Sequence, residues 1–400
     1  MTSNWDAFYG PAGLRPVINV SGTMTSLGAS IAVPEVTEAM AAILPRFVNM
    51  HELHGRAAKA IAESTGAESG FVTASASAGI TIAIAAAMTG PDMARIEQLP
   101  DATGMKDAVI VQTGHLCHYG APVEQAVRLA GARVVPIGTA TLAVEHNLTG
   151  ALEDDVAAAL YVVSHHVVDY GQLPLKRFAE LCHERGVPVI VDAASEYDLA
   201  GFLRDGADIV IYSAHKFLSG PTGGIVAGRR DLVRAAYMQN GGVGRGMKVG
   251  KETIAGVMAA LSAWSRRDHE AVRAREDEAA RAWLQAAEGF EGVDARLEPD
   301  PTDNPLDRLV VRVDPRRAGA SALAIAADLA AGEPAIIIRD HESDRGIIQF
   351  DPCNLHEGQA EIVARRLRET LKRAAAGKLA EPDPDAWRRR SAAGYLAWEG

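Results

Sequence analysis

The stretch Ser213–Gly224, SAHKFLSGPTGG, decides the fold because it sets a lysine, Lys216, between an apolar strand and a glycine-rich turn. The preceding run ADIVIYS, residues 207–213, is rich in β-branched residues and is typical of a strand buried on both faces. An ammonium group at the end of such a strand is costly unless it is paired or neutralised, and an imine with an aldehyde cofactor would neutralise or delocalise its charge. The glycines allow close backbone approach to a ligand, and Ser213 and Thr222 could offer hydroxyls to a phosphate. By itself the motif fits a pyridoxal phosphate lysine and an exposed lysine before an ordinary turn about equally well.

A second stretch favours the cofactor. VPVIVDAAS, residues 187–195, is another apolar strand and ends at Asp192. Two neighbouring parallel strands would bring Asp192 and Lys216 to the carboxyl edge of a sheet, where open α/β sheets bind ligands. Pyridoxal phosphate needs both groups, because the lysine holds its aldehyde carbon and a carboxylate keeps its pyridine nitrogen protonated. An aspartate at a strand end is otherwise usually a turn residue or a helix cap. We therefore predict Lys216 and Asp192 as catalytic residues and pyridoxal 5'-phosphate as the cofactor.

The cofactor phosphate is assigned to residues 70–90, GFVTASASAGITIAIAAAMTG, where a short strand runs into an apolar helix that starts with small residues. Free N–H groups and the helix dipole favour an anion at such a start. We place the phosphate at Ser75, Ala76 and Ser77, although a buried helix with a serine cap would have the same sequence. No GxGxxG or GxxxxGK[ST] motif competes for this role. Further candidate cofactor contacts around the lysine are Ser213, His215, Thr222 and Gly223.

The loop GHLCHYGA, residues 114–121, follows the predicted strand DAVIVQT and should lie at the same edge of the sheet. His115 or His118 could stack on the pyridine ring there, or could simply be solvated. His115 is therefore a candidate catalytic and cofactor-binding residue and His118 a candidate substrate ligand. The HELH run, residues 51–54, lacks the HExxH spacing of zinc enzymes, and no metal site is expected.

Length and composition limit the classes of protein that need to be considered. A chain of 400 residues predicts two domains, and 48% hydrophobic with 23% charged residues is an ordinary soluble composition. The net charge of −11 argues against a nucleic-acid partner. The three cysteines are scattered, the N-terminus does not resemble a signal peptide, and no apolar stretch approaches the roughly 20 residues of a membrane span. We expect a cytoplasmic protein with no membrane partner.

Strands alternate with helices from Thr73 to Ala227, which predicts a mostly parallel sheet with right-handed crossovers. We expect residues 1–45 to pack on both domains, residues 46–265 to form a large α/β domain, residues 266–378 to form a small C-terminal α+β domain, and residues 379–400 to be a tail. This tail could be disordered or could dock on a partner subunit through Trp387, Tyr395 and Trp398. The glycine-rich loop at residues 237–252 carries Arg245 and Lys248, which suit an anionic substrate group or simple solvation.

The order of INVSGT, TGAES, QTGHL, GQLPL, VDAAS, SAHKFLSGPTGG and GRGMKVGKE resembles the selenocysteine-synthase-like branch of fold-type-I pyridoxal phosphate enzymes. This branch includes L-seryl-tRNA(Sec) selenium transferase and the D-glucosaminate phosphate ammonia-lyases, and the chain looks closer to the ammonia-lyases. The resemblance spans residues 14–372 and implies an aspartate aminotransferase-like fold with a large sheet of the seven-stranded type.

By matching motif, the resemblance implies Lys216 as the imine lysine, Asp192 as the partner of the pyridine nitrogen, and Ala76 and Ser77 as the phosphate loop. It implies that Arg339, in IIIRD, holds a substrate carboxylate. In the family the glycine-rich loop approaches a neighbouring active site, so a homodimer or an assembly of dimers is expected. The RNA-binding N-terminal portion of the selenium transferase is not seen, and with the acidic balance this disfavours a tRNA substrate.

These residues suit several reactions on a small-molecule amino-acid substrate. Lys216 could remove the Cα proton as a general base while Arg339 fixes the carboxylate. Loss of a β-substituent, such as a hydroxyl, would then give a keto acid and ammonia, and the resemblance favours this α,β-elimination. The same groups would serve an amino-acid racemase or epimerase or an aldolase, and tRNA-dependent selenium transfer is less favoured. A carrier or regulator that binds pyridoxal phosphate without turnover is the non-enzymatic alternative.

Overall fold

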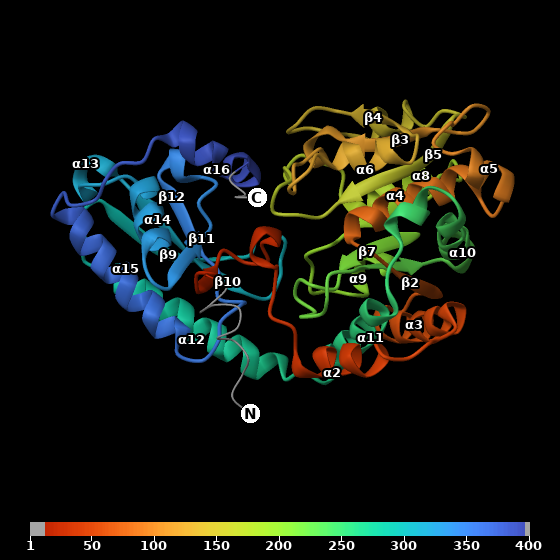
Figure 1. Ribbon diagram of the computed structural model, residues 1–400. Helices are drawn as coiled ribbons and strands as arrows, with labels where there is room; N and C mark the ends of the chain where they lie inside the picture. The colour runs from red at the N-terminus through yellow and green to blue at the C-terminus, as the bar shows by residue number, and fades with distance from the viewer. Residues whose placement is uncertain (1–12, 397–400) are drawn as a thin grey trace. The chain divides into compact units, whose positions relative to one another are not determined.

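The computed structural model describes residues 13–396, which form two compact units (Figure 1). One unit contains residues 28–267. The other combines residues 13–27 with residues 268–396, so that a short N-terminal segment belongs to the same unit as the C-terminal part of the chain. The finer division expected at residues 45, 265 and 378 stays a prediction.

The first unit is organised around a seven-stranded sheet with the strand order β2-β8-β7-β6-β5-β3-β4. All neighbouring pairs are parallel except those of β8, which is antiparallel to β2 and to β7. The expected mostly parallel α/β sheet is thus confirmed. β8 departs from the alternation of strand and helix because residues 214–223 join it to β7 through a turn. The strands are β2 (Ser69–Thr73), β3 (Ala108–Gln112), β4 (Arg133–Ile137), β5 (Val156–Val162), β6 (Val189–Asp192), β7 (Ile209–Ser213) and β8 (Gly224–Gly228).

Helices cover both faces of this sheet because alternate residues of its strands enter two separate cores. Ile110 packs in one core with residues of α3, α8 and α11, whereas Val109 and Val111 pack in the other with residues of α4, α6 and α10. Capping residues fix the ends of the helices. In α3, for example, the Asn49 side chain caps the first turn, and Gly66 ends the helix in the left-handed conformation. The helices are α2 (Pro34–Ile43), α3 (Met50–Thr65), α4 (Ala76–Thr89), α5 (Met93–Gln98), α6 (Val123–Leu129), α7 (Glu145–Thr149), α8 (Leu175–His183), α9 (Gly201–Arg204), α10 (Arg230–Met238) and α11 (Lys251–Arg266).

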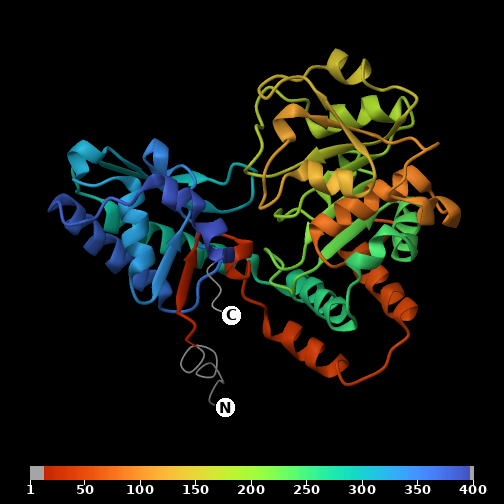
Figure 2. The ribbon, with the colours of Figure 1, turned by 45° about the horizontal axis from the view of Figure 1, so that its top comes forward.

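The second unit contains a three-stranded antiparallel sheet and a separate parallel pair of strands (Figure 2). In the pair, N-terminal β1 (Val17–Val20) lies beside β11 (Ala335–Ile338). The three-stranded sheet has the order β12-β10-β9, from β9 (Val293–Pro299), β10 (Asp307–Val313) and β12 (Ile347–Phe350). The helices are α12 (His269–Ala287), α13 (Pro315–Ala318), α14 (Ala322–Ala331), α15 (Gln359–Ala375) and α16 (Pro384–Leu396). Trp283 is fully buried in the core of this unit, and its indole N–H donates to the Ala360 carbonyl at 3.0 Å.

The tail of the chain is helical from Pro384. Proline suits the first turn of a helix because a backbone N–H there would have no partner within the helix, so its absence costs nothing. Trp387 binds Asp340 of its own unit, with 2.7 Å between the indole nitrogen and the carboxylate. The docking role considered for Tyr395 and Trp398 concerns side chains outside the described part of the structure. No helix within residues 13–396 has both the length and the apolar character needed to cross a lipid bilayer.

Candidate active site

The carboxyl edge of the large sheet collects the residues singled out by sequence. β6 ends at Asp192, which lies in register with Val162 of β5 on one side and Ile211 of β7 on the other. Lys216 follows β7 in the first turn beyond Ser213. The two side chains are close enough for the charge of each to shift the pKa of the other. The parallel strand register therefore brings the candidate amine and carboxylate together, as expected from their positions after neighbouring strands.

Burial sets the electrostatics of this pair. Asp192 is 6% exposed and accepts a hydrogen bond from the Ala194 N–H at 3.2 Å. Burial raises its pKa to about 6, and the Lys216 charge opposes this rise. Burial lowers the pKa of Lys216, and the carboxylates of Asp192 and Glu196 partly offset that effect. A lysine whose neutral form is favoured is a better nucleophile and a better base at neutral pH.

The backbone around Lys216 is tightly constrained. Ser219 adopts a left-handed conformation with a φ of 53°, and its N–H donates to the Lys216 carbonyl at 3.0 Å. The next N–H, from Gly220, donates to Ala214 at 2.8 Å. A Cβ atom at Gly220 would lie 2.8 Å from the Ala214 oxygen, so only glycine fits there. Strained, over-determined backbone of this kind is found mainly at functional sites.

The other candidates beside Lys216 have distinct environments. Ser213 is buried, and its hydroxyl lies 3.1 Å from Nδ1 of His215. Burial lowers the pKa of His215, with the Lys216 charge as the second cause. Gly223 accepts the Ala214 N–H at 2.9 Å, while Thr222 is exposed. The structure therefore places Ser213 at the end of β7 and His215 and Gly223 in the turn that follows, and it leaves the Thr222 side chain at the surface.

The start of α4, named here the anion cradle for the role predicted from its sequence, lies at the same edge of the sheet. Ser75 caps the helix: its hydroxyl accepts the Ala78 N–H at 3.1 Å, and its carbonyl accepts that of Gly79 at 3.0 Å. Within residues 13–396 the N–H groups of Ala76 and Ser77 have no hydrogen-bond acceptor, so both can bind a ligand anion. β2 runs parallel to β7 because both are antiparallel to β8, so the cradle lies at the same edge as Lys216. The amine, the carboxylate and the N–H cradle together fit the aldehyde, pyridine nitrogen and phosphate of pyridoxal phosphate.

The loop after β3 carries the two candidate histidines, His115 and His118, which lie in different environments. The buried His115 ring accepts the Val162 N–H on Nδ1 at 3.2 Å and meets Tyr161 edge-on, with 4.5 Å between ring centres. Burial lowers its pKa to about 4, so this imidazole is neutral. His118 is exposed. Stacking of His115 on the pyridine ring stays a prediction.

Cys117 and Tyr119 are the residues of this loop that interact electrostatically with Asp192. Burial raises the pKa of the Cys117 thiol to about 11, and the Tyr119 hydroxyl lies 3.2 Å from that of Ser77 in the anion cradle. Glu196, a third addition, is 7% exposed and interacts with Lys216. In the sequence only their positions could have pointed to them. Cys117 and Tyr119 lie next to the candidate histidine His118, and Glu196 is four residues beyond Asp192.

Arg339 directly follows β11 in the second unit. Its side chain is 8% exposed, and no carboxylate of residues 13–396 lies within ion-pair distance of its guanidinium. The nearby Asp351 is bound instead by Arg308, whose Nε lies 2.8 Å from the carboxylate, and Arg308 also pairs with Asp300. Gly22 has a φ of 87°, and a Cβ atom there would come within 3.3 Å of the Arg339 guanidinium. A buried arginine without its own counter-ion is suited to a ligand carboxylate.

The glycine-rich loop forms two short 3₁₀ turns, Gln239–Gly241 and Val243–Met247. Arg245 and Lys248 are both exposed. Lys251 differs, because its amine donates to the Arg46 carbonyl and lies 6.0 Å from the Phe47 ring centre. In residues 13–396 no three histidine, cysteine or acidic side chains are grouped as metal ligands.

The sheet, the anion cradle and the Lys216–Asp192 pair define a pyridoxal phosphate-dependent enzyme of fold type I. Comparison with known proteins gives the family: the model of the L-seryl-tRNA selenium transferase family matches residues 17–275, and the chain belongs to this family. Both the resemblance noted from the motifs and the expected cofactor are confirmed.

Individual relatives are similar over nearly the whole chain. D-glucosaminate-6-phosphate ammonia lyase from Salmonella typhimurium is 38% identical over 94% of this chain and 100% of that protein. The solved structure of a D-glucosaminate-6-phosphate ammonia-lyase, also 38% identical, covers the same shares with a TM-score of 0.82. The 5'-C-glycyluridine monooxygenase-decarboxylase from a Streptomyces species is 35% identical over 91% of this chain and 92% of that protein.

Proposed function

We propose that this protein is a pyridoxal phosphate-dependent ammonia-lyase that catalyses α,β-elimination from a hydroxylated or otherwise β-substituted amino acid. The observation that carries the proposal is the buried Lys216–Asp192 pair beside the anion cradle, in a chain that is 38% identical over 94% of its length to a D-glucosaminate-6-phosphate ammonia lyase. A D-glucosaminate phosphate, whose carbon next to Cα carries a hydroxyl, is the first substrate to test. The products would be a keto acid and ammonia.

The bound cofactor would supply an electron sink for the carbanion formed at the substrate Cα. Ser75, Ala76 and Ser77 would hold its phosphate, and Asp192 its pyridine nitrogen. Lys216 would hold the aldehyde carbon before substrate binds and would then take the Cα proton on its neutral amine. The lowered pKa of Lys216 supports this role, because it increases the fraction of unprotonated amine.

Arg339 would bind the substrate carboxylate and so fix the Cα–H bond in the orientation needed for proton removal. Its missing counter-ion within residues 13–396 supports this. The remaining candidates keep the roles predicted from the sequence. They are His115, Ser213, His215, Thr222 and Gly223 toward the cofactor, and His118, Arg245 and Lys248 toward an anionic substrate.

We also propose a cytoplasmic homodimer, or an assembly of dimers, with no nucleic-acid partner. Two apolar side chains beyond α2 support an interface there, since Leu44 is 52% exposed and Phe47 is completely exposed. The net charge of −11 disfavours nucleic acid. Light scattering of the wild-type protein and of Phe47→Asp tests the assembly, and an unchanged mass for the variant would place the interface elsewhere.

The decisive experiment measures the visible absorption of the cofactor-loaded protein before and after borohydride, together with keto acid and ammonia release from D-glucosaminate 6-phosphate. Lys216→Ala should lose the reducible chromophore and turnover, whereas Lys106→Ala, an exposed lysine outside the site, should keep both. A wild-type protein with no chromophore after soaking in pyridoxal phosphate would refute the cofactor assignment. A chromophore without elimination from any hydroxylated amino acid would refute the reaction.

A second reaction has a specific observation in its favour, namely the 35% identity to a monooxygenase-decarboxylase. An oxygen electrode separates the two, because elimination consumes no oxygen and releases no carbon dioxide. Racemisation and aldol cleavage can be detected in the same samples. Racemisation would exchange the Cα proton without releasing ammonia, and aldol cleavage would release an aldehyde.

A further inference from the structure

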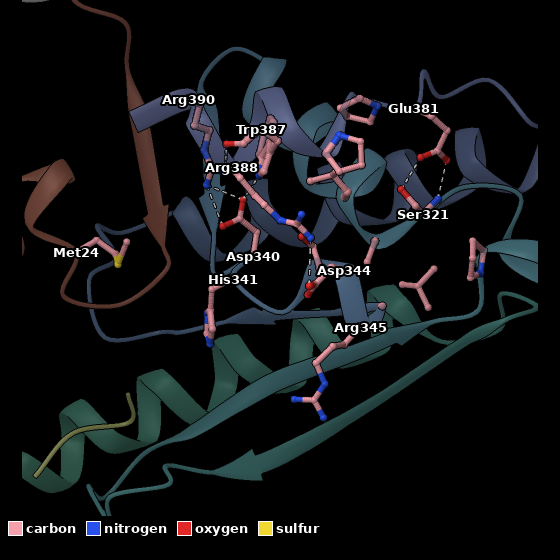
Figure 3. Close-up of a pocket in the computed structure, with 18 residues that line it drawn as sticks. Met24, Ser321, Asp340, His341, Asp344, Arg345, Glu381, Trp387, Arg388 and Arg390 are labelled. Atoms are coloured by element: carbon pink, nitrogen blue, oxygen red, sulfur yellow. Dashed lines mark hydrogen bonds and ion pairs between the residues drawn. The ribbon is translucent and has the colours of Figure 1, made fainter. Parts of the chain in front are cut away.

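The C-terminal helix α16 is hydrogen-bonded to Asp340, the residue that directly follows Arg339. The Asp340 carboxylate accepts the Trp387 indole N–H at 2.7 Å and the Arg390 guanidinium at 2.8 and 3.0 Å (Figure 3). The Arg390 guanidinium also lies 4.2 Å from the centre of the Trp387 ring, so the two donors stabilise each other. Asp340 is only 14% exposed, which makes this a better shielded ion pair than most on a protein surface.

Two more contacts hold the same tail. Arg388 pairs with Asp344 at 3.4 Å, in the loop between β11 and β12. Glu381 accepts the backbone N–H of Ser321 at 2.8 Å and its hydroxyl at 2.5 Å, at the start of α14. The tail thus covers a pocket of about 830 Å³ within this unit. Each acidic side chain that lines this pocket is bound by another lining residue, which indicates a structural clamp rather than a ligand site.

Asp340 follows Arg339 directly, so contacts to Asp340 help to fix the backbone of Arg339. The backbone of Arg339 exchanges two hydrogen bonds with Gln349, at 3.0 and 2.9 Å, and the preceding Ile338 pairs with Val20 of β1. Beyond this point the chain leaves the strand, and Asp340 is held by its carbonyl, which accepts the Ser343 N–H at 3.0 Å, and by its side-chain contacts to α16. The contact of α16 is therefore made to the residue covalently next to Arg339, at the point where the strand ends.

We propose that α16 is a positioning element for Arg339: Trp387 and Arg390 hold Asp340 and thereby fix the arginine that binds the substrate carboxylate. The proposal rests on the function proposed above for Arg339. Neither Trp387 nor Arg390 touches the substrate in this account. Their loss should weaken substrate binding and leave the chemistry at Lys216 intact.

The test compares Arg390→Ala with Arg389→Ala in the full-length, cofactor-loaded protein. Arg389 is the matched control, because it lies on the same helix and its side chain makes no hydrogen bond or ion pair within residues 13–396. Arg390→Ala should raise KM about three- to tenfold with kcat within about twofold, since small displacements of a binding group are costly. Arg389→Ala should change neither constant. Arg390→Lys should restore part of the KM because it keeps the charge and loses the two-pronged contact.

Two further measurements show that the effect passes through Asp340. In an Asp340→Asn background, Arg390→Ala should add almost nothing to KM, because the contact is already weakened. Amide hydrogen exchange should increase at residues 335–341 in Arg390→Ala and stay unchanged in Arg389→Ala. A general loss of stability would instead lower kcat through a smaller active fraction.

Equal KM values for Arg390→Ala and Arg389→Ala, or additive effects in the Asp340→Asn background, would overturn the proposal. So would unchanged hydrogen exchange at residues 335–341, which needs no substrate and decides the structural part alone. A failure of the proposed function gives results that differ from these. If Arg339 does not bind the substrate, Arg339→Lys will leave KM unchanged. If the reaction is wrong, the wild-type protein will turn over no amino acid.

Discussion

Replacing Asp192 by asparagine should stabilise the cofactor-free protein at pH 8 and should abolish turnover by the cofactor-loaded protein. The side chain is buried, and its burial raises the pKa from 3.8 to about 6. This difference corresponds to about 3 kcal/mol of unfavourable free energy for the ionised form in the folded protein. Asparagine has the same shape, keeps an acceptor for the Ala194 N–H, and does not ionise. The expected gain in the free energy of unfolding is therefore up to about 3 kcal/mol.

The pH dependence has a defined direction. A raised pKa means that the folded protein holds this proton more tightly than the unfolded chain, so the wild-type free energy of unfolding falls as pH rises from about 4 to about 6. Asp192→Asn lacks this fall. Urea denaturation of the two cofactor-free proteins should give matching stabilities below pH 4 and the full difference above pH 7.

Asp208 provides a matched control in the same sheet. It precedes β7 at the opposite edge, is 5% exposed, and binds the Val189 N–H at 2.7 Å, His183 at 2.8 Å and Arg229 at 2.9 Å. Because those partners would be left unsatisfied, Asp208→Asn should destabilise the protein by about 1–3 kcal/mol at pH 8. The reasoning is refuted if Asp192→Asn is also destabilising at pH 8, since that would show the carboxylate to be favourable in the folded protein.

Three other substitutions test separate parts of the structure. Ser75→Ala removes the cap of α4 and should cost about 1 kcal/mol of stability and weaken cofactor retention on dialysis; unchanged retention would contradict the cradle. Tyr212→Phe removes a buried hydroxyl that has no partner within residues 13–396, so thermal denaturation should show no loss and up to about 1 kcal/mol of gain. Arg308→Met leaves Asp300 and Asp351 buried without their cation and should destabilise by about 3–5 kcal/mol in denaturant; a neutral effect would show that the pair is dispensable.

The sheet edge could be predicted from the sequence because strand ends and side-chain chemistry coincide there. Buried strands ending at Asp192 and near Lys216 carry a local signal, apolar runs followed by a polar group, and parallel pairing brings such ends together. The antiparallel direction of β8 required knowledge that its short connection forms a turn rather than a helix. The helix α16 was hidden by Pro382 and Pro384, because proline marks both the breaks and the first turns of helices.

Side-chain direction within loops is what the sequence could not give. His115 and His118 were chosen for their rings, yet the residues of that loop which interact with Asp192 are Cys117 and Tyr119. Loop backbones follow no fixed period, so neighbouring residues cannot be sorted into those that face a ligand and those that do not. That Arg339 has no ion-pair partner in the described part of the chain is equally invisible in sequence, since it depends on Arg308 having already bound Asp351.

The candidate site contains groups whose burial or backbone conformation lowers the stability of the large unit. Burial disfavours the charged forms of Asp192 and Lys216, and Ser219 is held in a left-handed conformation. At the opposite edge Asp208 has a partner for each oxygen, so the same residue type is satisfied where no ligand is expected. The contrast follows from function: groups that must meet a cofactor cannot be fully satisfied by the protein, and the buried α4 and central strands supply the stability that allows this.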